Sequence, residues 1–262
     1  MEQGRDATGM ALLGKCGSIV SVLERDGEAS VAALAATVGE PVSSTYRLLA
    51  ALSEVGWVDR GSRRGLFRLG VKFVRIGSLL EDQLSVRDAS REALQSLRAA
   101  TGSTTFLCIL RDDAAVCVER LAGHEVQSLA MRIGDSLPLF RGAAPLALFA
   151  FLPRGEQDAM LTRIAARRDA GDDVPAESTL RRLIRTTRET GHSVSDEDVT
   201  PGIAAIGAPV FNHRGELEAA ISVSGLRHRI LDDALDVAAL TVSAALDISR
   251  ALGYEPAEGA GS

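Results

Sequence analysis

The chain has 262 residues, of which 46% are hydrophobic and 24% charged, and this composition predicts a globular protein long enough for two domains. No apolar run approaches the roughly 18 residues that a membrane-spanning helix needs, and the polar stretch 1–9 has no signal-peptide pattern. Three cysteines without a CxxC spacing fit a reducing compartment. We therefore expect a cytoplasmic protein with no membrane partner.

The net charge of −6 is unevenly distributed along the chain. Residues 1–80 carry ten basic and eight acidic side chains, whereas the remainder carries 19 basic and 27 acidic ones. Within residues 40–75 the count is seven basic to three acidic. A basic patch beside an acidic body favours a DNA-binding domain attached to a second domain, although a solvated basic face has the same charge count.

Three short helices are predicted in the N-terminal segment. The first has apolar residues such as Leu12 and Ile19 at helical spacing, and the second begins at the N-cap Ser30 and ends at Gly39. The third, over residues 42–52, is polar in its first turns and apolar in its later ones. This pattern predicts a helix-turn-helix whose second helix inserts its first turns into the major groove. An ordinary helical bundle is the alternative.

A β-hairpin is predicted directly after the third helix. Residues 56–60 and 66–70 have strand patterns, and residues 61–65 form the turn. An arginine-rich hairpin in this position is a wing, whose side chains reach phosphates or the minor groove. The predicted DNA-binding residues are those of the third helix and the wing: Ser43, Ser44, Thr45, Tyr46, Arg47, Arg60, Arg63, Arg64 and Arg68.

The run VAALAATVGEPVSSTYRLLAALSEVGWVDR, followed by LFRLG, resembles the DNA-binding domain of the IclR (isocitrate lyase regulator) family of bacterial transcription factors. The matching features are Gly39-Glu40-Pro41, Arg47-Leu48-Leu49, Gly56-Trp57 and Arg68-Leu69-Gly70. The resemblance implies a winged helix-turn-helix over residues 1–70 that binds double-stranded operator DNA as a homodimer, with a dimer of dimers as the alternative. It also implies that the helical segment 71–100 is a linker that helps the DNA-binding domains dimerise.

The hydrophobic period changes after residue 103. Strands are predicted over 103–110, 114–120, 126–133, 203–211 and 217–224, and helices over 142–151, 155–167, 178–190 and 231–252. These elements predict an α+β domain, with a mixed sheet and flanking helices, over residues 101–254. The Gly/Ala-rich tail, residues 255–262, is expected to be disordered.

The family resemblance extends over this second domain through the runs GDSLPL, GIAAIGAPVF and ISVSG. It implies a GAF-like domain whose small-molecule effector, a small organic acid or another polar metabolite, controls a transcriptional regulator, expected to be a repressor. Carried over position by position, the effector contacts are Val126, Leu129, Ala143, Ala144, Ser195, Asp196, Ile203, Ala205, Ser222 and Ser224.

The chemistry of these residues leaves two interpretations open. Ser222 and Ser224 alternate along one strand, so their hydroxyls share a face and can bind a ligand, or else they point to solvent or bond within the sheet. The histidine and lysine that many family members have near residues 140–147 are absent, although the backbone amides of Ala143 and Ala144 can still bind a carboxylate. The alternative is a regulator without an effector, whose second domain only holds the dimer together.

The sequence contains no pattern for an enzyme. The four histidines have no metal-ligand spacing, and no nucleophile elbow, P-loop or dinucleotide motif is present. The acidic run Asp196-Glu197-Asp198 is typical of a solvated loop. We therefore expect no cofactor, no metal and no catalysis, with an enzyme in a GAF-like domain as the remote alternative. Cys108 and Cys117 could face each other across a hairpin, but buried, inert thiols are favoured over a redox role.

Overall fold

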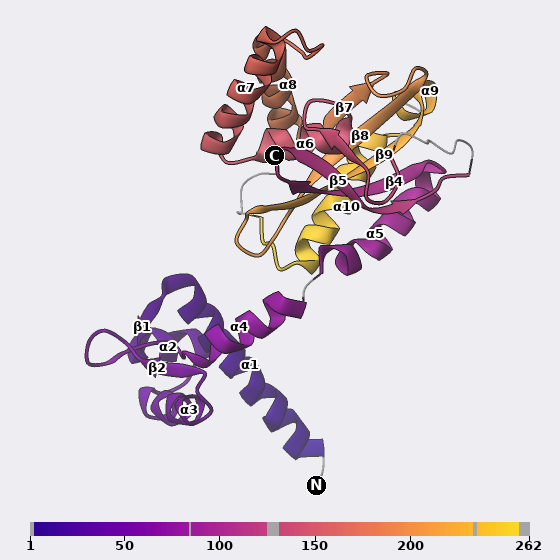
Figure 1. The fold of residues 1–262 in the computed structure, drawn as a ribbon. Coiled ribbons are helices and arrows are strands. Elements are labelled where there is room, and N and C mark those ends of the chain that lie inside the picture. The colour runs from indigo at the N-terminus through magenta and orange to yellow at the C-terminus, as the bar shows by residue number, and fades with distance from the viewer. Residues whose placement is uncertain (1–2, 84, 125–130, 233–234, 257–262) are drawn as a thin grey trace. The chain divides into compact units, whose positions relative to one another are not determined.

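The computed structural model describes residues 3–83, 85–124, 131–232 and 235–256 (Figure 1). The chain divides into two compact units, Met1–Gln83 and Leu84–Ser262. Of the segment 71–100, expected to be a helical linker, the first helix lies in the first unit and the second helix in the second unit. None of the described helices is both long and apolar enough to span a membrane.

The first unit combines helices with a three-stranded antiparallel sheet of order β1-β3-β2. Its elements are α1 (Gln3–Asp26), β1 (Glu28–Ser30), α2 (Val31–Val38), α3 (Val42–Glu54), β2 (Val58–Arg60), β3 (Leu66–Leu69) and α4 (Lys72–Gln83). The predicted helix ends of α2 are confirmed: the Ser30 hydroxyl accepts the N–H of Ala33 at 3.2 Å, and Gly39 has the left-handed φ of 66°. Strand β1 was not predicted, since three residues are too few to show a period.

The core of the first unit lies where α1, α2 and α3 meet the small sheet. Ile19, Leu34, Leu49 and Phe67 are buried there. Leu12, which the helical pattern placed with this core, is instead 52% exposed, because α1 extends beyond the other elements of the core at its N-terminal end. The expected wing is present, as β2 and β3 are antiparallel neighbours joined by the turn 61–65.

The second unit is built on a six-stranded sheet of order β6-β5-β4-β9-β8-β7. Its elements are α5 (Val86–Thr101), β4 (Thr104–Arg111), β5 (Ala114–Leu121), β6 (Ser136–Pro138), α6 (Ala143–Phe151), α7 (Arg154–Asp169), α8 (Glu177–Thr190), β7 (Ser193–Asp196), β8 (Ile203–Phe211), β9 (Leu217–Leu226), α9 (Arg227–Ile230) and α10 (Val237–Ala251). The α+β class is confirmed. The sheet is antiparallel at each described pairing rather than mixed, because α6–α8 connect opposite edge strands and form no parallel crossover between neighbours.

Two further expectations differ from the structure. The predicted strand 126–133 lies partly outside the described residues, and residues 131–133 are not a strand; the third strand here is β6. The predicted helix 231–252 begins only at Val237, because the Asp236 carboxylate caps it by accepting the N–H of Ala239 at 2.9 Å. Strand β7 was missed, since its four residues have no hydrophobic alternation strong enough to mark a strand.

Helices cover both faces of the six-stranded sheet (Figure 1). On one face, α6, α7 and α8 pack against side chains such as Phe106 and Cys108 of β4. On the other, α5 and α10 pack against Leu107 of β4 and Ile221 of β9. Adjacent residues of one strand therefore enter opposite cores, as the pleat requires. The functional features of this unit lie on the α6 face.

Candidate functional site

The third helix, α3, presents a polar first turn to solvent. Ser43, Tyr46 and Arg47 are exposed, Ser44 is half-buried, and an Arg47 Nη donates to the Ser44 hydroxyl at 3.4 Å. Tyr46 also packs edge-on against Phe67 of β3, with ring centres 6.3 Å apart. The exposed hydroxyls and guanidinium have the chemistry that binds phosphates and base edges in a DNA groove.

Thr45 was predicted to bind DNA, and the structure contradicts this. Its side chain is fully buried, and its hydroxyl donates to the carbonyl of Pro41 at 3.2 Å. Thr45 precedes the buried Leu49 by four residues, so the two side chains share the core-facing side of α3. The helical period of the sequence contains this signal, because the hydroxyl of Thr45 lies in a polar run while its position follows the apolar side of α3.

The wing carries four exposed arginines, Arg60, Arg63, Arg64 and Arg68. The Arg60 guanidinium lies over the ring of Phe67, 4.8 Å from its centre, so this arginine is partly held against the sheet. The other three arginines lie at the turn or on the outer side of β3. All four of these predicted residues therefore stay on an exposed surface.

Sequence analysis missed Glu28, which fixes the tip of the wing. One carboxylate oxygen accepts the N–H of Ser62 at 2.7 Å and the other accepts the Ser62 hydroxyl at 2.6 Å. These bonds lower the pKa of Glu28, and the nearby Arg68 and Arg63 act in the same direction. Glu28 comes from the unpredicted strand β1, 34 residues before its partner, so no local pattern could indicate the contact.

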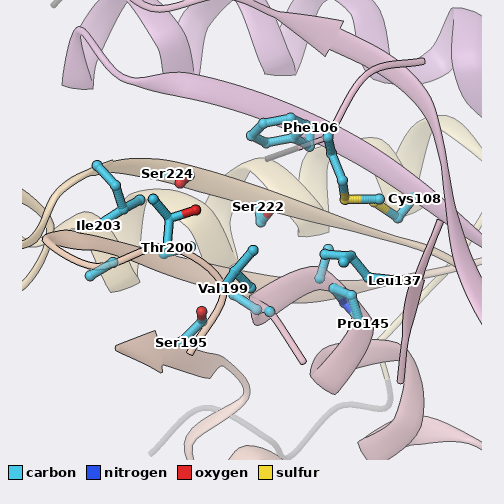
Figure 2. A pocket seen from close by; sticks show the side chains of 16 residues that line it. Phe106, Cys108, Leu137, Pro145, Ser195, Val199, Thr200, Ile203, Ser222 and Ser224 are labelled. Carbon is cyan, nitrogen blue, oxygen red and sulfur yellow. The ribbon is translucent and has the colours of Figure 1, made fainter. Parts of the chain in front are cut away.

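A cavity of about 50 Å³ lies in the second unit between the sheet and the start of α6 (Figure 2). Of the predicted effector contacts, Ala143, Ala144, Ser195, Ile203, Ala205, Ser222 and Ser224 line it. The further lining residues are mainly apolar and were not predicted: Phe106, Cys108, Met131, Leu137, Gly142, Pro145, Val199, Thr200 and Ala204. Gly142, Pro145 and Ala204 adjoin predicted residues in the chain, whereas Phe106, Cys108 and Leu137 come from distant segments that no local pattern connects to the cavity.

Strand register explains why the serines converge on the cavity. Ser195, Ala205 and Ser224 are direct neighbours across β7, β8 and β9, so they form one row on one face of the sheet. Ser222 is two residues before Ser224 and opposite Phe106, which places it in the next row of the same face. Ser222 and Ser224 are 6% and 8% exposed, and neither hydroxyl has a hydrogen-bond partner within the described part of the chain.

The first turn of α6 is held tightly against the sheet. The Ser193 hydroxyl donates to the Ala143 carbonyl at 2.6 Å, and the N–H of Gly142 donates to the Asp198 carboxylate at 2.8 Å. A Cβ at Gly207 would lie 2.6 Å from the carbonyl carbon of Ala143, so only glycine allows this approach. The first N–H groups of a helix have no partner within it, so the held turn offers donors toward the cavity.

Asp198 also fixes the direction of the Ser195 hydroxyl, because the second carboxylate oxygen of Asp198 accepts a hydrogen bond from this hydroxyl. Ser195 therefore presents an acceptor to the cavity, while Ser222 and Ser224 can still donate. The described lining contains no lysine, arginine or histidine. No group of three or more potential metal ligands is found among the described residues.

Of the remaining predicted effector contacts, one described residue, Asp196, does not line the cavity. Asp196 follows Ser195 on β7, and the pleat turns its side chain to the opposite, exposed face. There its carboxylate pairs with Arg227, at 2.6 Å from Nε and 2.8 Å from Nη2, and this contact lowers the pKa of Asp196. Val126 and Leu129 lie outside the described residues.

Comparison with known proteins matches both units. Residues 15–62 match the IclR helix-turn-helix domain, and residues 80–250 match the C-terminal domain of the bacterial transcriptional regulator IclR. The chain is 30% identical over 222 residues to the HTH-type transcriptional regulator KipR of Bacillus subtilis, which covers 84% of this chain and 88% of KipR. It is 26% identical over 235 residues to the transcriptional repressor IclR of Escherichia coli, covering 88% and 86% of the two chains.

Solved structures agree with these matches. Pseudomonas aeruginosa HmgR has a TM-score of 0.77 and 25% identity to this chain, and the likeness covers 91% of this chain and 96% of HmgR. Thermotoga maritima IclR has a TM-score of 0.60 and 25% identity, over 94% and 100% of the two chains. The chain is thus a DNA-binding regulator and not an enzyme. It belongs to the IclR family of bacterial transcriptional regulators, with a helix-turn-helix domain and a C-terminal effector domain.

Proposed function

We propose that this regulator is a repressor that binds operator DNA as a homodimer and is controlled by a small polar metabolite in the cavity beside α6. The observation that carries the ligand proposal is the pair of hydroxyls on Ser222 and Ser224. Both face a cavity and neither is bonded within the described chain. Polar groups that are almost fully buried are normally satisfied, so two such hydroxyls indicate a polar occupant.

The cavity restricts the chemistry of this occupant. The volume of the cavity is only about 50 Å³, so the inserted part of the ligand is small. The serine hydroxyls and the first N–H groups of α6 are hydrogen-bond donors that suit a carboxylate or a carbonyl. Apolar side chains such as Phe106 and Leu137 suit a short aliphatic group. A small monocarboxylic acid combines these properties, whereas a multiply charged ligand lacks basic partners in the described lining.

Repression and dimerisation are supported by separate observations. The Escherichia coli relative is named a transcriptional repressor. The first unit exposes large apolar side chains on α1 and at the start of α4, including Met10, Leu13, Val71 and Val74, each at least 66% exposed. A second copy that covers such side chains would gain about 25 cal/mol for each Å² of apolar surface removed from water.

The test is a double variant, Ser222→Ala/Ser224→Ala, compared with the parent protein in a thermal screen of small carboxylic acids. A ligand at 100 times its dissociation constant stabilises the parent by about 2.7 kcal/mol, and the variant should lose most of this shift. Unliganded operator affinity should be unchanged, since an effector acts only through its coupling free energy. Ser243→Ala, on α10 at the opposite side of the sheet, is the matched control.

Two results would contradict the proposal. A double variant that folds and still responds to the acid with unchanged sensitivity would show that the ligand binds elsewhere. A parent protein that no small acid stabilises would favour the alternative of a C-terminal domain that only dimerises.

A further inference from the structure

Two cysteines lie side by side next to the cavity, and one of them, Cys108, lines it. Cys108 of β4 is directly opposite Cys117 of β5 in the strand register, and both thiols are free. Both side chains belong to the core on the α6 face, at 0% and 1% exposure. Cys108 lines the cavity, as Figure 2 shows, and Cys117 lies next to Cys108 on the neighbouring strand.

The backbone around Cys117 shows which kind of strand pair this is. Its N–H donates to the Asp135 carbonyl at 2.9 Å, and its own carbonyl accepts the N–H of Gly134 at 2.8 Å. Both groups therefore point away from β4, so Cys108 and Cys117 form a non-hydrogen-bonded pair, directly after a register shift between Leu107 and Cys108. Regular pairs of this kind have Cα atoms about 4.5 Å apart. A disulfide spans Cα separations of about 4.4–6.8 Å, so the pair can close without strand separation.

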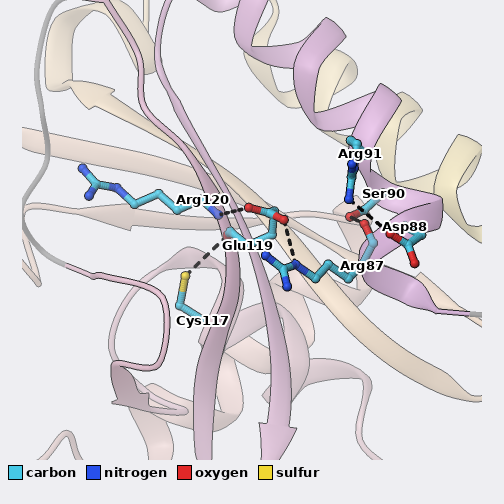
Figure 3. Close-up of polar contacts among 7 residues, drawn as sticks. All are labelled: Arg87, Asp88, Ser90, Arg91, Cys117, Glu119 and Arg120. Carbon is cyan, nitrogen blue, oxygen red and sulfur yellow. Dashed lines mark hydrogen bonds and ion pairs between the residues drawn. The ribbon is translucent and has the colours of Figure 1, made fainter.

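The surroundings of the two thiols differ, and Figure 3 shows those of Cys117, whose Sγ donates to the Glu119 carbonyl at 3.4 Å. A hydrogen bond with Cys108 lowers the pKa of the Cys117 thiol, and Arg120 acts in the same direction, whereas burial and the charge of Asp135 act against it. The same hydrogen bond, together with burial, raises the pKa of Cys108. The nearby Glu119 carboxylate is paired with Arg87 Nε at 2.8 Å, so its charge is largely compensated. Cys117 is thus the better thiolate and Cys108 the resolving thiol.

We propose that Cys108 and Cys117 form an oxidisable dithiol, and that a small hydroperoxide entering the cavity converts it to an intramolecular disulfide. The Cys117 sulfur attacks the peroxide, an S–O bond forms, the O–O bond breaks, and the leaving oxygen departs as water or an alcohol. Cys108 then attacks this sulfenic acid, the S–S bond forms, and the S–O oxygen leaves as water with the Cys108 proton. Two thiols lose two electrons, and one hydroperoxide is reduced.

The pair can be mapped in the full-length parent protein. Reduced protein is treated with hydrogen peroxide, alkylated and digested with trypsin, which cleaves after Arg111 and so separates Cys108 from Cys117. We expect the peptides 99–111 and 112–120 to be joined by a disulfide, and the thiol titre to fall from three to one. Persistence of alkylated Cys108 and Cys117 under conditions that oxidise Cys16 would overturn the proposal.

Single variants test the order of the two steps with dimedone, which traps sulfenic acids. In Cys108→Ala the sulfenic acid should accumulate, and dimedone should label Cys117. In Cys117→Ala no labelling of Cys108 is expected. Cys16→Ala, in the other unit, is the matched control and should form the disulfide as the parent does. Labelling of Cys108 instead of Cys117 would contradict the assigned roles. The disulfide mapping uses the parent protein, so it does not depend on the folding of any variant.

Discussion

Thr45 shows how one residue can have the chemistry of a DNA contact and the position of a core residue. Its hydroxyl is used by the Pro41 carbonyl, and its methyl group packs in the core. Thr45→Val should therefore lower the free energy of unfolding by about 0.5–1.5 kcal/mol, the usual contribution of one hydrogen bond, without changing operator affinity. Ser44→Ala is the comparison and should weaken DNA binding. Chemical denaturation and an operator titration measure the two effects, and a loss of affinity in Thr45→Val would contradict this placement.

Substitutions of the arginine on α3 and of the arginines on the wing should have different effects on DNA binding. Arg47→Ala should lose about 1–3 kcal/mol of binding free energy for one base identity, because a guanidinium on the exposed face of α3 can read a base edge. Arg63→Ala and Arg64→Ala should weaken binding to all operator sequences equally. Each should also reduce the slope of log K against log salt concentration by about one unit, because a phosphate contact releases counterions. Titrations on operator variants at several salt concentrations separate the two classes. If Arg47→Ala lost the same binding free energy on every operator variant, this would instead indicate that Arg47 contacts a phosphate.

The wing, taken as an element, depends on a carboxylate outside its own hairpin. The Ser62 bonds lower the pKa of Glu28 below its ordinary value of 4.5, so the folded state binds the proton more weakly than the unfolded chain. The stability that Glu28 contributes is therefore complete above about pH 4.5 and is lost as pH falls through the lower folded pKa.

Glu28→Gln should accordingly flatten the acid side of the stability curve. Thermal midpoints of the parent and the variant, measured between pH 6 and about pH 3, should converge as the parent loses this contribution. Glu54→Gln, on α3 of the same unit, is the matched control. A constant difference between parent and Glu28→Gln across this range would show that the Ser62 contact does not depend on the charge.

Elements were predictable from the sequence where local chemistry marks them. Helix α2 has a serine cap and a terminal glycine, and the wing is two strand patterns around a polar turn, so both were found. The antiparallel order of the second sheet, β1 and β7 were not, because pairing between distant strands has no local signal. The same reason explains which cavity residues were predicted. Ser222 and Ser224 lie on one strand, whereas Phe106 and Val199 are brought to the cavity only by tertiary folding.

At the scale of the whole molecule, a single helix-turn-helix gives each chain one recognition helix. One such helix reads few base pairs, so strong specificity needs a second copy, and the twofold symmetry of a dimer appears in its operator. The exposed apolar side chains of α1 and α4 are consistent with this requirement. The proposed dimer would also give the effector domain a means of control, since a ligand can act by changing how two DNA-binding domains are spaced.

The most direct test of this account is a footprint of the purified protein on the genomic DNA fragments that it retains. We expect protection of a pseudo-palindrome whose half-sites are about 10–10.5 base pairs apart, centre to centre, or a multiple of that spacing. Loss of one half-site should reduce protection of both. Protection of one isolated half-site by a monomer, or no preferred sequence among the retained fragments, would contradict the proposal that this regulator binds its operator as a dimeric repressor.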